Sequence, residues 1–263
     1  MAKGTFHRRS TTALSAKKKG SESRSFGFKK SIYAIAAAAL IVAVGVGLWQ
    51  QVLFNQAVKA EMPVKDSRCS GQNVVVRSPV NADALIACEA ARDAIEFLAS
   101  QDLDVPNDVP IEIVMTLPPV VSRSAAGGYL ESERRVFILV YSEFRKFKTW
   151  FGIPINRSLY RSLVSHEVAH LVADYNFKIP QPSIQAKEYM AYITQLSTME
   201  PALRKRVMSH FQCKAFEGDW QMCTTIYMFD CMGFGVRAYL HFLNQVNGRD
   251  YLHSILSGKA LVE

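Results

Sequence analysis

The alternation of hydrophobic and polar residues along this chain predicts a few short strands followed by a series of helices. Apolar residues recur at helical spacing between charged ones over residues 82–100, which predicts an amphipathic helix. Alternating and β-branched segments predict strands at 74–76, 111–115, 129–130 and 135–141, with Gly127-Gly128 as a tight bend. Further helices are expected over 157–175 (with Asn156 as a possible N-cap), 183–199, 202–211, 223–246 and 250–256. This order predicts an α+β domain, with a small mixed sheet packed on helices and a mainly helical C-terminal subdomain.

One segment is too apolar for a surface helix, because residues 32–54 contain no Asp, Glu, Lys or Arg. At about 1.5 Å per residue, its 23 residues can cross a hydrocarbon core about 30 Å thick. Lys29 and Lys30 precede the segment and Trp49 lies near its other end, so the positive-inside rule places the N-terminus in the cytoplasm. The alternatives are a signal peptide cleaved before Glu61 and a buried core helix, which is disfavoured because the segment has no polar face.

The expected organisation follows from that segment. We expect a basic cytoplasmic tail at 1–30, a transmembrane anchor at 31–54, a linker and first strand at 55–80, and a domain at 81–263. The protein is therefore expected to be a single-pass membrane protein whose domain lies outside the cytoplasm, in the periplasm if the cell is bacterial.

The net charge of +8 lies entirely in the tail. Residues 1–30 hold nine of the 31 Lys and Arg and one of the 23 Asp and Glu, so the remaining chain has 22 of each. A balanced domain has no overall field to attract a polyanion, and no nucleic-acid partner is expected. We interpret the tail as a topology determinant beside anionic lipid. A regulator that binds DNA through this tail is the least favoured hypothesis.

All five cysteines follow the apolar segment, where an oxidising exterior permits disulfides. Pairs between Cys69 and Cys88 and between Cys213 and Cys223 are expected, which leaves Cys231 free. Other connectivities stay open, because spacing alone does not determine them.

Residues His166-Glu167-Val168-Ala169-His170 form an H-E-x-x-H motif inside the helix expected at 157–175. Residues four apart on a helix differ in direction by about 40°, so both imidazoles can reach one ion. Glu167 lies to the side of that ion, where it can take a proton from water without binding the metal. A shuffled chain of this composition contains roughly 0.007 such motifs, so chance is a poor explanation. A pair of core histidines is the structural alternative.

The apolar residues of this helix lie nearly opposite the two histidines. They are Val164, Val168, Leu171, Val172 and Tyr175. We therefore expect one side of the helix to face the core and the histidine side to face a cleft.

A catalytic zinc needs a third protein ligand and an open position. Glu188 is the best candidate, because it follows His170 after 17 residues and opens the next predicted helix, which can fold back antiparallel. Asp174 is a weaker competitor, since it is on the same helix one turn beyond His170. The positions that carry a third His and a Gly in metzincins hold Asn176 and Ala173, so that class does not fit.

This motif, followed at this distance by Glu188, resembles the gluzincin group of zinc metallopeptidases, the thermolysin-like and aminopeptidase-like clan. Residues 234–243 and 252–256, with Asn247-Gly248 between them, are similar to the helical tail of that clan. The resemblance covers about residues 110–256. It implies a zincin-like fold, in which an edge strand within 135–141 lies over the cleft and the two ligand helices and a helical subdomain follow. It also implies Zn²⁺ as the cofactor and a peptide or protein as the substrate.

The resemblance further implies a Tyr or His donor beside the developing oxyanion. Tyr227 is the nearest candidate, with His210, Tyr239 and His241 behind it. The exopeptidase motif G-x-M-E-N is absent, so aminopeptidase activity has no support. The sequence thus predicts a membrane-anchored zinc peptidase with His166, His170 and Glu188 as ligands and Glu167 as the base. The alternative is an inactive binding or scaffold protein with a vestigial or structural zinc site.

Overall fold

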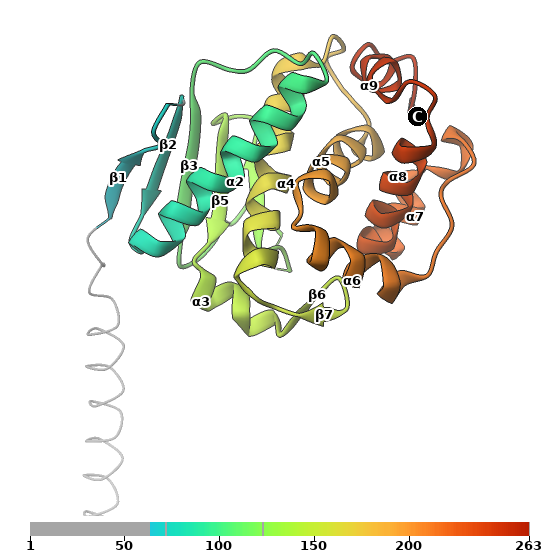
Figure 1. Cartoon of the computed structure of the whole chain (residues 1–263). Helices are drawn as coiled ribbons and strands as arrows, with labels where there is room; N and C mark the ends of the chain where they lie inside the picture. The colour runs from blue at the N-terminus through green and yellow to red at the C-terminus, as the bar shows by residue number, and fades with distance from the viewer. Residues whose placement is uncertain (1–63, 72, 123, 263) are drawn as a thin grey trace, which may run out of the picture. The chain divides into compact units, whose positions relative to one another are not determined.

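The computed structural model describes residues 64–71, 73–122 and 124–262, and a five-stranded mixed sheet occupies their first half (Figure 1). The strands are β1 (Lys65–Arg68), β2 (Val74–Ser78), β3 (Val109–Val114), β4 (Gly127–Leu130) and β5 (Arg135–Leu139). Their spatial order is β1-β2-β3-β5-β4; β2, β3 and β5 are parallel, and β1 and β4 are antiparallel to their neighbours. The predicted tail, anchor and start of the linker lie outside the described residues.

The two edge strands of this sheet are β1 and β4. The prediction that an edge strand lies within 135–141 is therefore wrong. Residues 135–139 form β5, which pairs with β3 on one side and with β4 on the other. Its Val136, Phe137 and Ile138 are all buried, as is typical of an interior strand. The tight bend expected at Gly127-Gly128 is also wrong, because both glycines are extended in β4. The chain turns after Leu130, where Arg134 has a positive φ of 49°.

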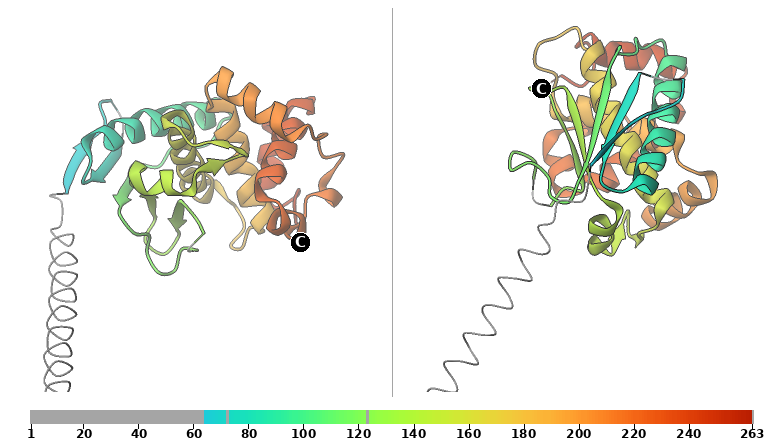
Figure 2. Two further views of the ribbon diagram at one scale, coloured as in Figure 1. Left: turned by 90° about the horizontal axis from the view of Figure 1, so that it is seen from below. Right: turned by 90° about the vertical axis from the view of Figure 1, so that its left-hand side faces the viewer.

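Helices cover one face of this sheet (Figure 2). α2 (Asn81–Ser100) lies along β2, and α4 (Arg157–Asn176) lies along β4 and β5. A row of fully buried alanines in α2, including Ala87, Ala90 and Ala91, allows the two helices to approach closely. Ser165 of α4 donates a hydrogen bond to the carbonyl of Ala90 at 3.2 Å. The predicted α+β architecture, with a mixed sheet against helices, is confirmed.

After β5 the described chain is helical apart from one short hairpin. Its elements are α3 (Tyr141–Phe144), the hairpin β6 (Thr149–Trp150) and β7 (Ile153–Pro154), α5 (Ile184–Thr198), α6 (Pro201–Phe211), α7 (Thr224–Phe229), α8 (Cys231–Asn244) and α9 (Gly248–Leu256). α5 packs along α4 on the side away from the sheet, and α8 packs on α5. In the parts of the chain that the structure describes, no helix has both the length and the apolarity to cross a bilayer.

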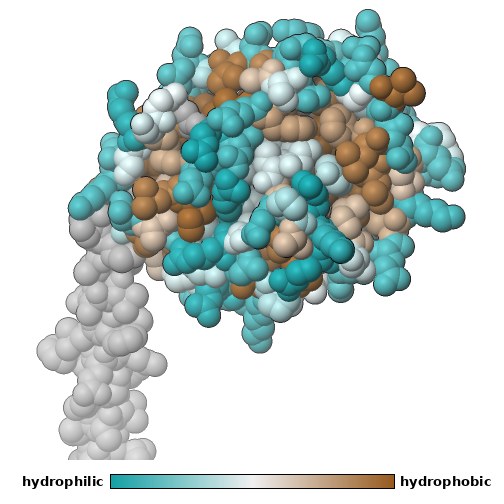
Figure 3. Space-filling model, in the orientation of Figure 1, coloured by the Kyte–Doolittle hydropathy of each residue, from teal (hydrophilic) through white to brown (hydrophobic). Residues whose placement is uncertain are grey.

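Because α4 lies between the sheet and α5, it is buried on nearly all sides. The expected division of this helix is confirmed: Val164, Val168, Leu171 and Val172 are buried in the core, and the histidine side lines a cavity, although His166 and Glu167 are only 8% and 7% exposed. Tyr175 departs from the expected core side, because it is 46% exposed. On the face of the molecule seen in Figure 3, hydrophilic residues surround separate hydrophobic patches. The motif therefore lies at the centre of the domain.

The segment predicted as one helix over 223–246 is divided into α7 and α8 at Asp230. The Asp230 carboxylate accepts a hydrogen bond from the backbone N–H of Gly233 at 2.9 Å, which caps the start of α8. Tyr227 of α7 packs edge-on against Phe234 of α8 at 5.7 Å and hydrogen-bonds Glu188 of α5.

The disulfide predicted between Cys69 and Cys88 is confirmed, and it joins the end of β1 to α2. The pair predicted between Cys213 and Cys223 is wrong, because both are free in the described structure, as is Cys231. The loop between α6 and α7 is held instead by Arg237, which donates to the Lys214 carbonyl and to the Gln221 side chain, both at 3.3 Å.

Candidate metal centre

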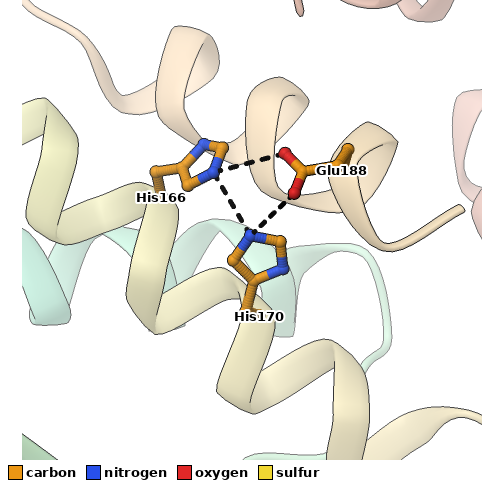
Figure 4. A group of neighbouring side chains, drawn as sticks. All are labelled: His166, His170 and Glu188. Carbon is orange, nitrogen blue, oxygen red and sulfur yellow. Dashed lines mark hydrogen bonds and ion pairs between the residues drawn. The ribbon is translucent and has the colours of Figure 1, made fainter. Parts of the chain in front are cut away.

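Two neighbouring helices bring the predicted ligands together (Figure 4). α4 carries His166 and His170, and α5 carries Glu188. Each helix begins at a residue that caps it: Asn156 accepts from the Leu159 N–H at 2.8 Å, and Ser183 accepts from the Ala186 N–H at 3.2 Å. These caps fix where each helix begins, and so which residues of α4 and α5 face each other.

The three side chains converge on one point. The Nε2 atoms of His166 and His170 are 3.2 Å apart, and they lie 3.6 Å and 3.7 Å from the Glu188 carboxylate oxygens. Ligands bound at about 2.0–2.1 Å in a tetrahedral zinc site are separated by about 3.3 Å. The observed spacing therefore suits an ion of this size, held by two nitrogens and one oxygen.

One oxygen of the buried Glu188 carboxylate also lacks a hydrogen-bond donor in the part of the chain that the structure describes. Its Oε2 is one of three buried side-chain polar atoms without a hydrogen bond among the described residues. A buried acceptor left unpaired is costly, and a cation between the two imidazoles and this oxygen would satisfy it. The residues present thus fit a bound metal ion.

A chain of hydrogen bonds orients His166. Its Nδ1 donates to Oε1 of the buried Gln195 at 3.1 Å, and Gln195 Nε2 donates to Ser162 Oγ at 3.3 Å. Ser162 in turn donates to the Leu159 carbonyl at 2.9 Å. With the proton held on Nδ1, the lone pair of Nε2 points at the metal position.

We expect Gln195→Leu to weaken zinc binding about 10- to 100-fold, because outer partners of ligating histidines contribute to this extent. Competition with a chromophoric chelator measures the affinity. Thr198→Val is the matched control, since Thr198 is on the same helix but bonds only backbone carbonyls of its own helix. Equal affinities of Gln195→Leu and the native protein would remove Gln195 from this role.

Burial shifts the pKa of every group in this cluster toward its neutral form. It raises the pKa of Glu188 to about 7, against a hydrogen bond from Tyr227, and it raises the pKa of Glu167 well above its ordinary value, with help from the Glu188 charge. It lowers the pKa of His170 to about 4, together with the nearby Lys187 charge. It also lowers the pKa of His166, to which His170 contributes. Burial therefore disfavours charge on every group of the metal-free cluster, and a cation bound there would favour the ionised form of Glu188.

Protons should compete with zinc for Glu188 but not for His170. At pH 6 the metal-free Glu188 is largely protonated and His170 is neutral, so zinc affinity should fall about tenfold per pH unit below 7. The pKa of Glu188 is about 7 in the folded chain and 4.5 in the unfolded chain. Its contribution to the stability of the metal-free fold is therefore fully present below pH 4.5 and is lost as the pH rises through 7. Zinc should therefore stabilise the domain more at high pH.

Calorimetry at pH 6, in buffers of different ionisation enthalpy, measures the protons released on zinc binding. The Glu167→Gln variant isolates Glu188, and we expect close to one proton for each zinc bound. Release of no proton would show that Glu188 does not bind the metal.

Glu167 lies against the edge strand of the sheet. A Cβ atom added to Gly127 of β4 would come within 2.9 Å of Glu167 Cγ and 3.0 Å of Oε1. Glycine is therefore required here by the close approach of a side chain to the strand. Glu167 thus lies beside Gly127 and lines the cavity, but it is not one of the three groups that converge on one point.

The variant Gly127→Ala should displace Glu167 and lower turnover of any substrate that depends on this base by about tenfold or more, because small misplacements of catalytic groups are costly. Zinc affinity should stay within about threefold, since no ligand contacts Gly127. Gly71→Ala, in an open turn with φ of +73°, controls for backbone strain alone. Unchanged turnover in Gly127→Ala would exclude this positioning role.

A cavity of about 480 Å³ opens beside the cluster. It is lined by all three ligand residues and by Glu167, and also by Tyr192, Tyr227 and Cys231 from the C-terminal helices. Of the proposed oxyanion donors, Tyr227 lines this cavity, and its pKa is raised by burial and by the Glu188 charge.

The other candidate residues lie elsewhere. His210 packs on Gly152 and Phe211, Tyr239 lies beside Arg204, and His241 bonds Tyr189 at 2.9 Å. Asp174 lines the cavity but accepts a hydrogen bond from Tyr129 at 2.8 Å, outside the ligand group.

Three residues of the site were not singled out from the sequence. Tyr192 stacks edge-on against the His166 ring at 4.6 Å, Gln195 bonds His166, and Gly127 accommodates Glu167. Tyr192 and Gln195 follow Glu188 at intervals of four and seven residues, so helical spacing from the third ligand points to both. No comparable local signal points to Gly127.

Comparison with known families places the chain among proteins whose activity has not been assigned. A family model described as a family of unknown function (DUF6639) matches residues 74–263, and the chain belongs to this family. No curated protein and no solved structure matches the chain.

Proposed function

We propose that this protein is a zinc-dependent peptidase of zincin-like architecture. The observation that carries the proposal is the convergence of two imidazoles and a carboxylate on one point, with a further buried carboxylate, Glu167, beside them in the same cavity. Two nitrogen ligands and one oxygen ligand are a donor set typical of catalytic zinc, which leaves the fourth position open. When bound, zinc polarises a carbonyl and lowers the pKa of a water molecule toward 7.

Each residue then has a distinct role. His166, His170 and Glu188 hold the ion. Glu167 accepts the proton of the attacking water and passes it to the leaving amine. Tyr227, whose hydroxyl bonds Glu188 in the metal-free structure, would donate instead to the carbonyl oxygen as negative charge develops there. Its hydroxyl stays protonated at neutral pH because burial raises its pKa.

The open cavity favours a hydrolase over a scaffold with a structural zinc. Structural zinc sites are closed by four protein ligands, whereas this cluster has three and adjoins free volume. Glu167 would have no function in a structural site, yet it is held at the cavity wall by contact with Gly127.

The location of the protein is part of the same proposal. Residues 32–54 would anchor the chain in the membrane, with the peptidase domain outside the cytoplasm and a peptide or protein as its substrate. The Cys69–Cys88 disulfide supports an oxidising compartment.

The test is hydrolysis of a mixed peptide library by the purified full chain in detergent, loaded with zinc or treated with a chelator. Mass spectrometry identifies the products. We expect cleavage only by the zinc-loaded protein. A protein that retains zinc and cleaves nothing in the library would favour the scaffold.

A further inference from the structure

The turn between β4 and β5 is joined to both ligand helices at one end of the cavity. Glu131 of this turn forms an ion pair with Lys187 of α5, and both residues line the metal cavity. Lys187 directly precedes the ligand Glu188 in the chain. The ion pair therefore links the turn after β4 to α5 at the wall of the cavity, one residue before the ligand Glu188.

Two further contacts hold the same turn in place. The Tyr129 hydroxyl donates to Asp174 Oδ2 at 2.8 Å, and the Arg134 guanidinium lies 5.7 Å from the centre of the Tyr175 ring. Asp174 lies one turn beyond His170, at the C-terminal half of α4. An exposed ion pair is weak by itself, but these contacts fix the turn independently of it.

The distance along β4 limits what fits between the metal centre and this ion pair. Gly127 contacts Glu167, and Glu131 follows four residues later, which corresponds to about 13 Å of strand. A substrate extended beside β4 therefore has room for about three residues on this side before it meets the Glu131–Lys187 pair. Trp150 and Cys231, which line the same cavity from other elements, have no such ion pair beside them among the described residues.

We propose that the Glu131–Lys187 pair makes the cleft blind on this side, so that the substrates are short peptides or chain ends. This inference rests on the proposed peptidase function and adds a limit on substrate length. A chain end enters from the open side, and at most about three residues extend past the cleaved bond toward the pair. The middle of a long polypeptide is excluded, because it would have to pass this ion pair.

The test is a peptide ladder on the zinc-loaded full chain. One cleaved core peptide is extended by one to six Gly-Ser residues at its N-terminus in one series and at its C-terminus in the other. For the native protein, kcat/KM should fall at least tenfold in one series once more than about three residues extend beyond the cleaved bond, and should stay within about threefold in the other series. Equal tolerance of both series would overturn the inference.

Variants identify the residues responsible. Glu131→Gln combined with Tyr129→Phe should abolish the length limit without changing turnover of the core peptide more than about threefold. Exchange of the two charges, Glu131→Lys with Lys187→Glu, keeps an ion pair at this place, so this variant should show the same length limit as the native protein. Lys146→Met is the control, since it removes an exposed ion pair with Glu143 away from the cavity. If the length limit persisted in the Glu131→Gln, Tyr129→Phe variant, another part of the cleft would be responsible for it.

A binding measurement separates this inference from the proposed function. The zinc-loaded Glu167→Gln variant binds the fluorescently labelled ladder without turnover, and anisotropy measures each affinity. If the native protein cleaves no peptide but affinity falls at the same length, the peptidase proposal fails and the blind cleft stands. If affinity is independent of length in both series, the blind cleft fails.

Discussion

Replacing Glu167 by Gln is expected to lower peptide hydrolysis by at least about 100-fold while one zinc stays bound. General acid–base groups contribute about 10²- to 10⁴-fold, and Glu167 is the carboxylate of the cavity wall that adjoins the ligands without belonging to them. Burial raises the pKa of Glu167, so its neutral form is favoured in the metal-free protein. An amide of the same shape should therefore leave the metal-free fold as stable as before, or stabilise it.

Three measurements on the same preparation separate the possible effects: kcat/KM on a cleaved peptide, zinc content, and the thermal midpoint. Glu96→Gln, an exposed carboxylate of α2, is the matched control and should leave all three unchanged. Loss of zinc from Glu167→Gln would make Glu167 a ligand. Undiminished turnover would show that another group acts as the base.

Removing one metal ligand is expected to remove both the zinc and the stability that zinc confers. A ligand present at 1,000 times its Kd stabilises a fold by about 4 kcal/mol. For a domain of this size, each kcal/mol shifts the midpoint by about 2–4 °C. The native protein with zinc should therefore unfold about 10 °C above the chelator-treated protein, and His170→Ala should show no such difference.

Asp174→Asn is the control for this experiment, because Asp174 is on the same helix and was the competing ligand from the sequence. It bonds Tyr129 in the structure, so the variant should keep one zinc and the full zinc-dependent shift. If Asp174→Asn lost zinc and His170→Ala kept it, the ligand set described here would be wrong. Differential scanning calorimetry and metal analysis provide the two measurements.

The local features of the site were predictable because they depend on residues close together in the chain. Helical geometry places His166 and His170 on one face, and Asn156 caps the helix that carries them. The interval to Glu188, with two prolines between the helices, was sufficient to nominate the third ligand. The disulfide between Cys69 and Cys88, which are 19 residues apart in the chain, was also expected.

Expectations that depended on the order of strands and on packing between distant segments were wrong. The edge strand was assigned to 135–141, but β5 pairs on both sides and β4 is the edge. The helix predicted over 223–246 is divided at Asp230 into α7 and α8. Hydrophobicity shows which residues prefer burial, but not which neighbouring element buries them.

The sequence by itself determined the chemistry that the protein can carry: two imidazoles one helical turn apart, a carboxylate between them in sequence and another on the next helix. These follow from backbone geometry over a few residues, which is the same wherever the helix lies. Only the tertiary structure decided how that chemistry is surrounded. Gly127 lies beside Glu167, Gln195 bonds His166, and Glu131 meets Lys187 at the wall of the cavity, from segments up to 56 residues apart. Such contacts arise from the packing of the whole domain, so no local pattern in the chain specifies them.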